Sequence, residues 1–354
     1  MACHANNHLQ QNEGREIGNM KFDYAIGNPP YQEDRQGESK TALPVYHHFM
    51  EAAYSVSNAV ELITPARFLF DAGRTPKKWN EKMLNDEHFK VLQYEGDGQK
   101  IFPTTEIKGG VAITYRDIKK NFEPIGTFTV YPELNKILSR VKPFVDSSPS
   151  LAEISFVATK FSIDNLVVDF PKYTKHERRM SSNVLEFECF NASKKNDSDI
   201  GIYGIYEGKR NIRYIAEKYV DLSDKAIRLY KIVLPKADGN GTFGDTLTNP
   251  EVLGINMGFT HTFLGIGGFR TREEAENLNK YIKTRFARTL LGILKVTQDM
   301  NADKWKYVPL QDFTPNSDIN WSASIRDIDQ QLYKKYGLSQ QEIDFIESHV
   351  KEMA

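Results

Sequence analysis

The residues whose types and spacing could do chemistry lie in one short stretch, Lys21 to Gln32, which reads KFDYAIGNPPYQ. Proline cannot donate a backbone hydrogen bond, and it pushes the residue before it toward extended backbone angles. The turn Asn28-Pro29-Pro30-Tyr31 therefore presents two acceptors, the Asn28 side-chain oxygen and the Pro29 carbonyl. Tyr31 adds an aromatic face on which a planar heterocycle can stack. Two acceptors beside a stacking face suit a planar amine such as adenine.

The alternative interpretation of this tetrad is an ordinary Pro-Pro turn at the end of a strand. Phe22, Tyr24 and Ile26 alternate with less apolar residues before Gly27, a pattern typical of a short strand stopped by a turn. From average residue frequencies, the four letters arise by chance in roughly one chain in a thousand of this length. The position of the tetrad directly after a strand favours a function over an accident.

Alternating strand and helix patterns follow the tetrad. Their order, strand, helix, strand, helix, strand and then a paired strand, predicts the second half of a doubly wound α/β sheet. The expected helices are 43–57 and 76–85, and the expected strands after the first are 60–63, 89–94 and 111–115.

The tetrad resembles motif IV of the methyltransferases that modify the N6 amino group of adenine in DNA. In that family the Asn oxygen and the first Pro carbonyl bind the two amino protons. This draws the nitrogen lone pair out of the ring as it attacks the methyl group of S-adenosylmethionine. The resemblance implies that Asn28, Pro29, Pro30 and Tyr31 are catalytic, that S-adenosylmethionine is the cofactor, and that the target base is flipped out of the duplex.

The resemblance extends through Asp117, with a motif VIII over Ile101-Phe102-Pro103 and the strand 111–115. In relatives the aromatic residue before that proline packs against the other face of the base. Phe102 is therefore the candidate for a second stacking wall beside Tyr31, with core packing as the alternative.

A complete methyltransferase of this family also has an earlier strand ending in a glycine-rich turn, followed by an acidic residue for the cofactor ribose. Residues 1–20 are polar and without periodicity, and we expect a disordered lead-in there. Residues 21–118 are thus expected to be a partial catalytic domain that lacks cofactor motif I. Cofactor-binding residues stay unknown, and a partner chain or domain is expected to supply the missing half.

A second domain is predicted after a proline-rich connector over 119–150. Short β-like runs separated by Gly, Asn and Asp, at 154–158, 166–170, 200–206 and 232–234, predict strands and indicate an α+β domain over 151–320. Several stretches resemble the DNA target-recognition domain of Eco57I-like restriction-modification methylases: Tyr203-Gly204-Ile205 with Lys209-Arg210, the run 235–241, Phe269-Arg270-Thr271 and the run 308–313. Residues 321–354 are expected to form a helical tail, with Ser339 and Glu342 as a capping box.

In that family the recognition domain holds double-stranded DNA, which requires phosphate contacts and a few base-specific donors. The net charge of −1 does not favour nucleic acid by itself, but residues 280–295 contain five basic residues and no acidic one. A basic helix face exposed to solvent is the alternative for that stretch. The residues that we expect to contact DNA are Arg210, Arg213, Lys236, Lys283, Arg285 and Arg288.

Composition argues against several other classes of protein. The chain has no apolar run long enough to span a membrane and no secretory pattern, so we expect a cytoplasmic protein. Two cysteines are too few for a disulfide framework or a four-thiolate zinc site, and we expect no metal. Asp23 with Glu38 and Lys40 imitates the spacing of a nuclease site, but Glu38 falls in a polar loop. The open alternative to a methyltransferase is a DNA-binding or specificity module without catalysis.

Overall fold

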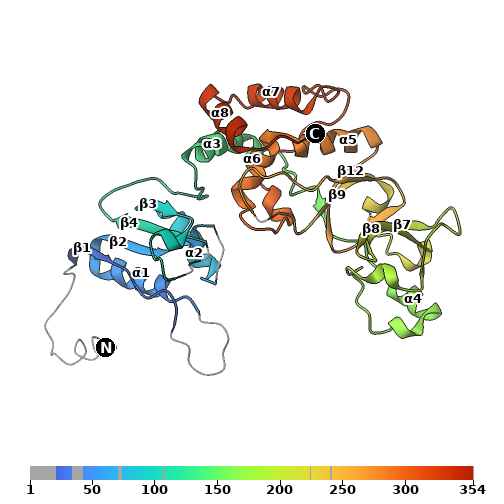
Figure 1. Ribbon diagram of the computed structural model, residues 1–354, viewed down its shortest axis with the longest axis horizontal. Helices are drawn as coiled ribbons and strands as arrows, with labels where there is room; N and C mark the ends of the chain where they lie inside the picture. Colours follow the sequence, from blue (N-terminus) through green and yellow to red (C-terminus); the bar gives the residue numbers. More distant parts are fainter. Residues whose placement is uncertain are drawn as a thin grey trace. The chain divides into compact units, whose positions relative to one another are not determined.

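The computed structural model describes residues 21–33, 43–70, 74–105, 107, 109–223, 225–239 and 241–353. The chain divides into two compact units, Met1–Val130 and Tyr131–Ala354 (Figure 1). The predicted connector is shared between them, and the predicted helical tail is part of the second unit. The predicted lead-in over 1–20 lies outside the described residues. Both units contain helices and sheets, which confirms the predicted α/β class in general terms.

The first unit is built on a four-stranded sheet with the order β1-β2-β4-β3. Strand β1 runs parallel to β2, whereas β4 runs antiparallel to both of its neighbours. The five elements that the sequence predicted after β1 are all present, with ends shifted by a few residues. The elements are β1 (Phe22–Gly27), α1 (Tyr46–Val56), β2 (Ser57–Pro65), α2 (Lys77–Leu84), β3 (Phe89–Glu95) and β4 (Val111–Asp117).

Helices α1 and α2 cover one face of this sheet. Because side chains alternate along a strand, Val60 and Leu62 of β2 point to the helices and are buried with Met50 of α1. On the other face, Glu61 and Ile63 are only half-buried. Strand β1 continues that second face with large exposed apolar side chains: Phe22 is 70% and Ile26 is 74% exposed.

The second unit contains two further four-stranded sheets and five longer helices. The sheets have the orders β10-β9-β12-β5 and β11-β7-β8-β6. The strands are β5 (Ser155–Phe156), β6 (Phe190–Asn191), β7 (Ile200–Tyr206), β8 (Lys209–Ile215), β9 (Tyr230–Pro235), β10 (Glu251–Leu253), β11 (Met257–Phe259) and β12 (Phe263–Phe269). The helices are α3 (Pro132–Ser147), α4 (Ile163–Asp169), α5 (Arg272–Lys283), α6 (Arg285–Leu294), α7 (Ile325–Lys335) and α8 (Gln340–His349), of which α4 is short.

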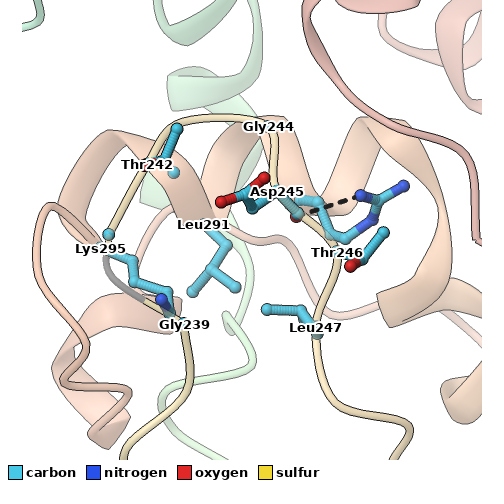
Figure 2. A pocket seen from close by; sticks show the side chains of 11 residues that line it. Gly239, Thr242, Gly244, Asp245, Thr246, Leu247, Leu291 and Lys295 are labelled. Carbon is cyan, nitrogen blue, oxygen red and sulfur yellow. Dashed lines mark hydrogen bonds between the residues drawn. The ribbon is translucent and has the colours of Figure 1, made fainter.

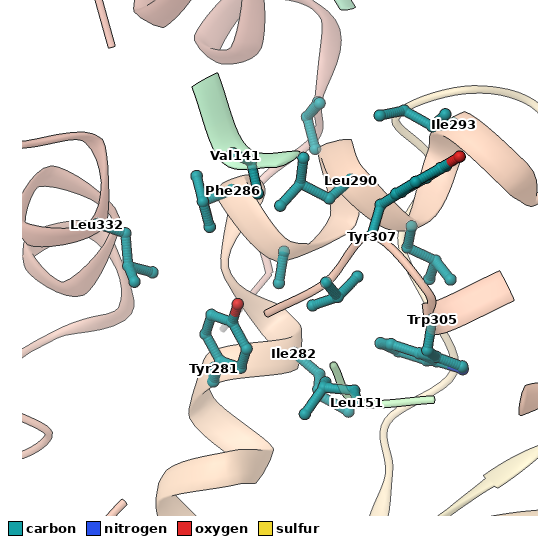
Figure 3. Close-up of a cluster of buried hydrophobic side chains, with 14 of the residues drawn as sticks. Val141, Leu151, Tyr281, Ile282, Phe286, Leu290, Ile293, Trp305, Tyr307 and Leu332 are labelled. Atoms are coloured by element: carbon teal, nitrogen blue, oxygen red, sulfur yellow. The ribbon is translucent and has the colours of Figure 1, made fainter. Parts of the chain in front are cut away.

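The main core of the second unit surrounds α5 and α6. Tyr281, Phe286 and Leu290 from these helices are fully buried, in one cluster with Val141 of α3 and Leu332 of α7 (Figure 3). The predicted tail is therefore not an appendage, because α7 and α8 supply part of this core. The predicted capping box of Ser339 with Glu342 is confirmed at the start of α8.

Two predicted elements of the second unit are wrong. The helix predicted through 280–295 is divided at Thr284, whose hydroxyl caps α6 by accepting from the Ala287 amide. The strand predicted at 166–170 is instead part of α4, with Leu166 buried and Val168 exposed. A short apolar run is compatible with either structure, so its pattern alone did not distinguish them.

None of the helices in the described part of the chain is both long and apolar enough to cross a membrane.

Candidate active site

The tetrad Asn28 to Tyr31 follows directly after Gly27, at the carboxyl end of β1. In open α/β sheets ligands bind at the carboxyl ends of the parallel strands. Asn28 is exposed and Pro29 is half-buried. The structure shows no hydrogen bond to the Asn28 side chain or the Pro29 carbonyl from any described residue. Both acceptors are thus without a hydrogen-bond donor within the described residues.

Backbone hydrogen bonds connect the tetrad to the start of α1. The Val45 amide donates to the Tyr31 carbonyl at 3.1 Å, and the Glu33 amide donates to the Leu43 carbonyl at 3.0 Å. Gln32 and Pro44 form an isolated β-bridge between these two bonds. The turn is thus held by the sheet on one side and by the helix entry on the other.

Tyr31 and Phe102 meet in the structure, although 70 residues separate them in the sequence. Their ring centroids lie 6.2 Å apart with an interplanar angle of 81°, an edge-to-face contact. The Phe102 amide donates to the Gly98 carbonyl at 2.8 Å, which fixes the turn that carries the ring. The two rings are not parallel, so in this arrangement they cannot both stack on one planar group.

The Tyr31 hydroxyl is buried and has no hydrogen-bond partner among the described residues. Burial raises the pKa of Tyr31 to about 12, so the phenol stays neutral at physiological pH. An unpaired buried hydroxyl costs free energy and is unusual in a folded protein. No sequence pattern indicates this unpaired hydroxyl, because its burial depends on the fold.

Two of the six cations that were expected to contact DNA are engaged inside the second unit. Arg288 is only 3% exposed, and its guanidinium donates to the carbonyls of Lys283, Asp245 and Lys351. Arg285 donates to the Val350 carbonyl at 2.9 Å and pairs with Glu347 and Glu352. These contacts give both arginines a structural role, and the burial of Arg288 does not favour a contact of its guanidinium with DNA.

The loop that receives Arg288 lies against α6 (Figure 2). Gly244, Asp245 and Leu247 come from the loop, Leu291 comes from the helix, and Lys295 directly follows its last residue. The pocket between them is small, about 30 Å³. Lys295 donates into the same loop, to the Asp238 carbonyl at 2.7 Å. The basic stretch 280–295 therefore closes part of the core instead of forming one exposed face.

The other four expected cations differ in exposure. Arg210 on β8 is exposed, with its guanidinium 5.9 Å from the Phe263 ring centroid. Arg213 on the same strand is half-buried over the Tyr206 ring, at 4.3 Å. Lys283 is half-buried beside an open cleft that Lys280 and Arg326 also line. Lys236 is half-buried directly after β9.

Two basic residues near Lys236 were missed in the sequence. Arg179 and His261 lie close to each other, with 3.1 Å between Arg179 Nη1 and His261 Nε2. Burial lowers the pKa of His261, and the positive charges of Lys236 and Arg179 lower it further. The pairing of β9 with β12 brings Lys236 beside the turn that holds His261. That pairing could not be read from the sequence.

The described part of the chain contains no group of three or more His, Cys, Asp or Glu side chains that could hold a metal ion.

Comparison with known proteins connects the first unit to a family. Residues 3–102 match the model of the Eco57I restriction-modification methylase family. An "Uncharacterized adenine-specific methylase" from Mycoplasma pneumoniae is 30% identical over 98 residues, which are 27% of this chain. The chain spans only 23% of the length of that relative. Over its first hundred residues, the chain is similar to the adenine methylases of the Eco57I type.

Proposed function

We propose that the chain carries the base-binding half of a site-specific DNA adenine N6-methyltransferase of a restriction-modification system, together with its DNA target-recognition domain. The observation that carries the proposal is the pair of available acceptors at Asn28 and Pro29, placed at the carboxyl end of a sheet strand. The family match over residues 3–102 and the nearby rings of Tyr31 and Phe102 support it.

The Asn28 oxygen and the Pro29 carbonyl accept the two amino protons of a flipped adenine. These two hydrogen bonds favour a lone pair localised on the nitrogen over one delocalised into the ring, which makes the nitrogen a better nucleophile. S-adenosylmethionine, when bound, would supply the methyl group by cleavage of its S–CH3 bond and would leave as S-adenosylhomocysteine, and the surplus proton of the methylated amino group would go to solvent. Tyr31 stacks on the base, and Phe102 closes the other face after its ring or that of Tyr31 rotates.

The strand order of the first sheet supports a further, cofactor-binding half of the catalytic domain that pairs with β1. Within the described residues β1 pairs only with β2, so its other edge is open, and Phe22 and Ile26 are exposed beside it. Parallel strands are normally buried on both faces. We propose that the cofactor-binding half, in the same polypeptide or in a partner chain, adds a parallel strand to β1 and covers these side chains. No described residues form a glycine-rich turn that would hold the cofactor at this edge.

The test uses the gene in its natural genomic context, where any partner is present. Asn28→Ala removes one of the two acceptors, and we expect at least a ~100-fold loss of methylation, comparable to the loss of one preorganised hydrogen bond in other active sites. Long-read sequencing that detects N6-methyladenine at a defined motif measures the change. Asn28→Asp is the matched control, because it keeps an acceptor oxygen and should retain part of the activity.

Equal loss in both variants, with less protein in the cell, would indicate a folding defect and not a lost acceptor. Full methylation in Asn28→Ala would contradict the catalytic proposal. If the unmodified strain has no N6-methyladenine that depends on this gene, the enzyme is not active as proposed.

The second candidate function is a DNA-binding module without catalysis. The observation that favours it is the size of the second unit, whose own core includes α3 and both tail helices. Calorimetry of the isolated chain with S-adenosylmethionine separates the two functions when combined with the genomic test. The module predicts duplex binding, no heat with the cofactor, and no methylation in the natural strain.

A further inference from the structure

We infer that Arg179, Lys236 and His261 form a binding site for a backbone phosphodiester of the DNA duplex, in which His261 takes up a proton. This group of three residues is called the cationic cluster below. The inference rests on the proposal that the second unit holds DNA. It adds Arg179 and His261 to the expected DNA contacts, and it adds the protonation of His261 on binding.

The backbone fixes all three positions of the cationic cluster. The His261 amide donates to the Met180 carbonyl at 2.8 Å, which connects the turn before β12 to the residue after Arg179. The Lys236 amide donates to the Thr262 carbonyl at 2.9 Å, and the Lys236 carbonyl accepts from Met300 at 2.8 Å. The three side chains therefore start from preorganised places and not from a flexible surface loop.

The positive charge of the cluster has little compensation. Lys236 has no ion-pair partner among the described residues, and both burial and the nearby Arg179 lower its pKa. Arg179 pairs with Glu177 at 3.3 Å, but both side chains are about half exposed, so solvent screens that pair. Half-buried cations that repel one another are stabilised by an anion between them. The protein itself supplies no second carboxylate for this role within the described chain.

The contact between Arg179 and His261 defines the protonation state of the imidazole. A guanidinium only donates, so His261 Nε2 must accept, and the proton of the neutral ring is on Nδ1. Burial, Lys236 and Arg179 lower the pKa of His261, and Glu177 is the one group that raises it. A phosphate oxygen placed between the Arg179 guanidinium and the His261 imidazole would instead raise the pKa of His261. Arg179 would turn to the phosphate, and His261 would gain a proton on Nε2.

The donors of the cationic cluster match the oxygens of a phosphodiester. The guanidinium offers a fork of N–H donors, the ammonium offers a point charge, and protonated imidazole offers one more donor. Arg179 is exposed and Lys236 and His261 are half-buried, so solvent and a passing strand of backbone can reach the cluster. Thr262 follows His261 and donates to the exposed Ser182 hydroxyl at 2.9 Å, which leaves the Ser182 proton for another phosphate oxygen.

The experiment measures binding of the full chain to a fluorescent duplex of mixed sequence, by anisotropy, from 50 to 200 mM NaCl at pH 8 and pH 6. Each cation that contacts a phosphate contributes about one unit to the slope of log affinity against log salt. We expect Arg179→Gln and Lys236→Gln each to reduce that slope by about one. Arg179→Lys keeps the charge and should keep the slope, so it controls for folding.

His261→Gln tests the proton. Because the pKa of His261 is low in the free chain and higher beside a phosphate, affinity of the unmodified chain should rise as the pH falls from 8 to 6. His261→Gln should match the unmodified chain at pH 8 and lose that gain at pH 6. The matched control for charge is Arg272→Gln on α5, an exposed arginine already paired with Glu276.

The outcomes separate the cluster from the proposed function. If the unmodified chain binds the duplex but Arg179→Gln and Lys236→Gln behave as Arg272→Gln does, the cluster is not a phosphate site and the recognition domain stands. If the unmodified chain does not bind duplex DNA, both proposals are wrong. Competition by millimolar inorganic phosphate at constant ionic strength would identify a site for free phosphate. This result would contradict the proposal that the cluster binds a phosphodiester.

Discussion

The candidate functional residues of the two units have opposite surroundings. In the first unit, the Asn28 and Pro29 acceptors lie at a strand end and have no partner within the described chain. In the second unit, Arg285 and Arg288 are enclosed by carbonyls and carboxylates of their own unit. Acceptors in a Pro-Pro turn keep their direction because local covalent geometry sets it. Whether a cation on a helix is buried or exposed depends on which distant segment of the chain packs beside it.

This difference shows how far a sequence pattern can predict the function of its residues. Arg285 meets residues 62 and 67 positions away in the sequence, and Arg288 meets one 63 positions away. The same five basic residues would be an exposed face if the C-terminal segment packed elsewhere. A charge pattern on one helix therefore predicts function only after its packing partners are known.

The largest expected effect comes from Arg288→Met, which keeps side-chain volume and removes the guanidinium. The carbonyls of Lys283, Asp245 and Lys351 lose their donor and the buried charge is lost, so we expect the free energy of unfolding of the second unit to fall by about 3 kcal/mol or more. Urea unfolding followed by Trp305 and Trp321 fluorescence measures it, in a Trp79→Phe background that silences the first unit. Arg272→Met, an exposed control, should change stability by no more than about 0.5 kcal/mol.

DNA binding of the same variant sharpens the comparison. The folded Arg288→Met protein should retain the salt dependence of the unmodified chain, because this guanidinium does not reach solvent. Unchanged stability together with a smaller slope of log affinity against log salt would show that Arg288 contacts a phosphate. The two units would then not differ in this respect.

A second prediction concerns Asp329, a buried carboxylate that accepts the amides of Arg285 at 3.0 Å and Phe286 at 2.8 Å. Burial raises its pKa to about 6, above the value of about 3.9 in an unfolded chain. The native state therefore binds the proton more tightly, and the stability from this group is full below pH 4. It is lost as the pH rises from about 4 to about 6, by roughly 2–3 kcal/mol.

Asp329→Asn removes that titration. The unfolding free energy of the unmodified chain minus that of the variant should fall by roughly 2–3 kcal/mol from pH 4 to pH 6 and be constant at higher pH. Urea unfolding at half-unit pH steps measures this difference, in which all other carboxylates cancel. A difference that stays level from pH 4 to pH 7 would show that Asp329 has an ordinary pKa.

Much of the first unit could be predicted from the sequence. The strands and helices between Phe22 and Asp117 have strong period-2 or helical patterns with short connections, so their types and order were clear. The insertion of β4 between β2 and β3 was not predicted, because pairing depends on contacts between segments and not on local pattern. The meeting of Tyr31 with Phe102 was expected only through the family resemblance.

Less of the second unit could be predicted. The break at Thr284 depends on a hydroxyl cap and on Asp329, which lies 45 residues further along the chain. The strand predicted at 166–170 failed because a run of five apolar-rich residues fits a helix turn as well as a strand. Sequence patterns describe local geometry, whereas the burial of Arg288 is a property of the assembled core.

A smaller effect is expected at Arg210, the exposed member of the predicted DNA contacts. Arg210→Gln should lower duplex affinity severalfold at 100 mM salt and reduce the salt slope by about one, without changing stability. Anisotropy titrations beside Arg272→Gln measure both quantities. An Arg210→Gln slope equal to that of the control would mean that exposure alone does not make a cation of this unit a DNA contact.

The smallest effect is expected at Tyr31, where Tyr31→Phe removes only the buried hydroxyl without a described partner. Because a desolvated unpaired hydroxyl costs free energy, the first unit should be equally stable or more stable by up to about 1 kcal/mol. Thermal unfolding measures this, and methylation in the natural strain should stay near normal because the stacking face is kept. A clear loss of stability would reveal a hydrogen bond to this hydroxyl. A loss of methylation at unchanged stability would instead show that the hydroxyl contacts the base or the cofactor, which would make the unpaired group part of the active site.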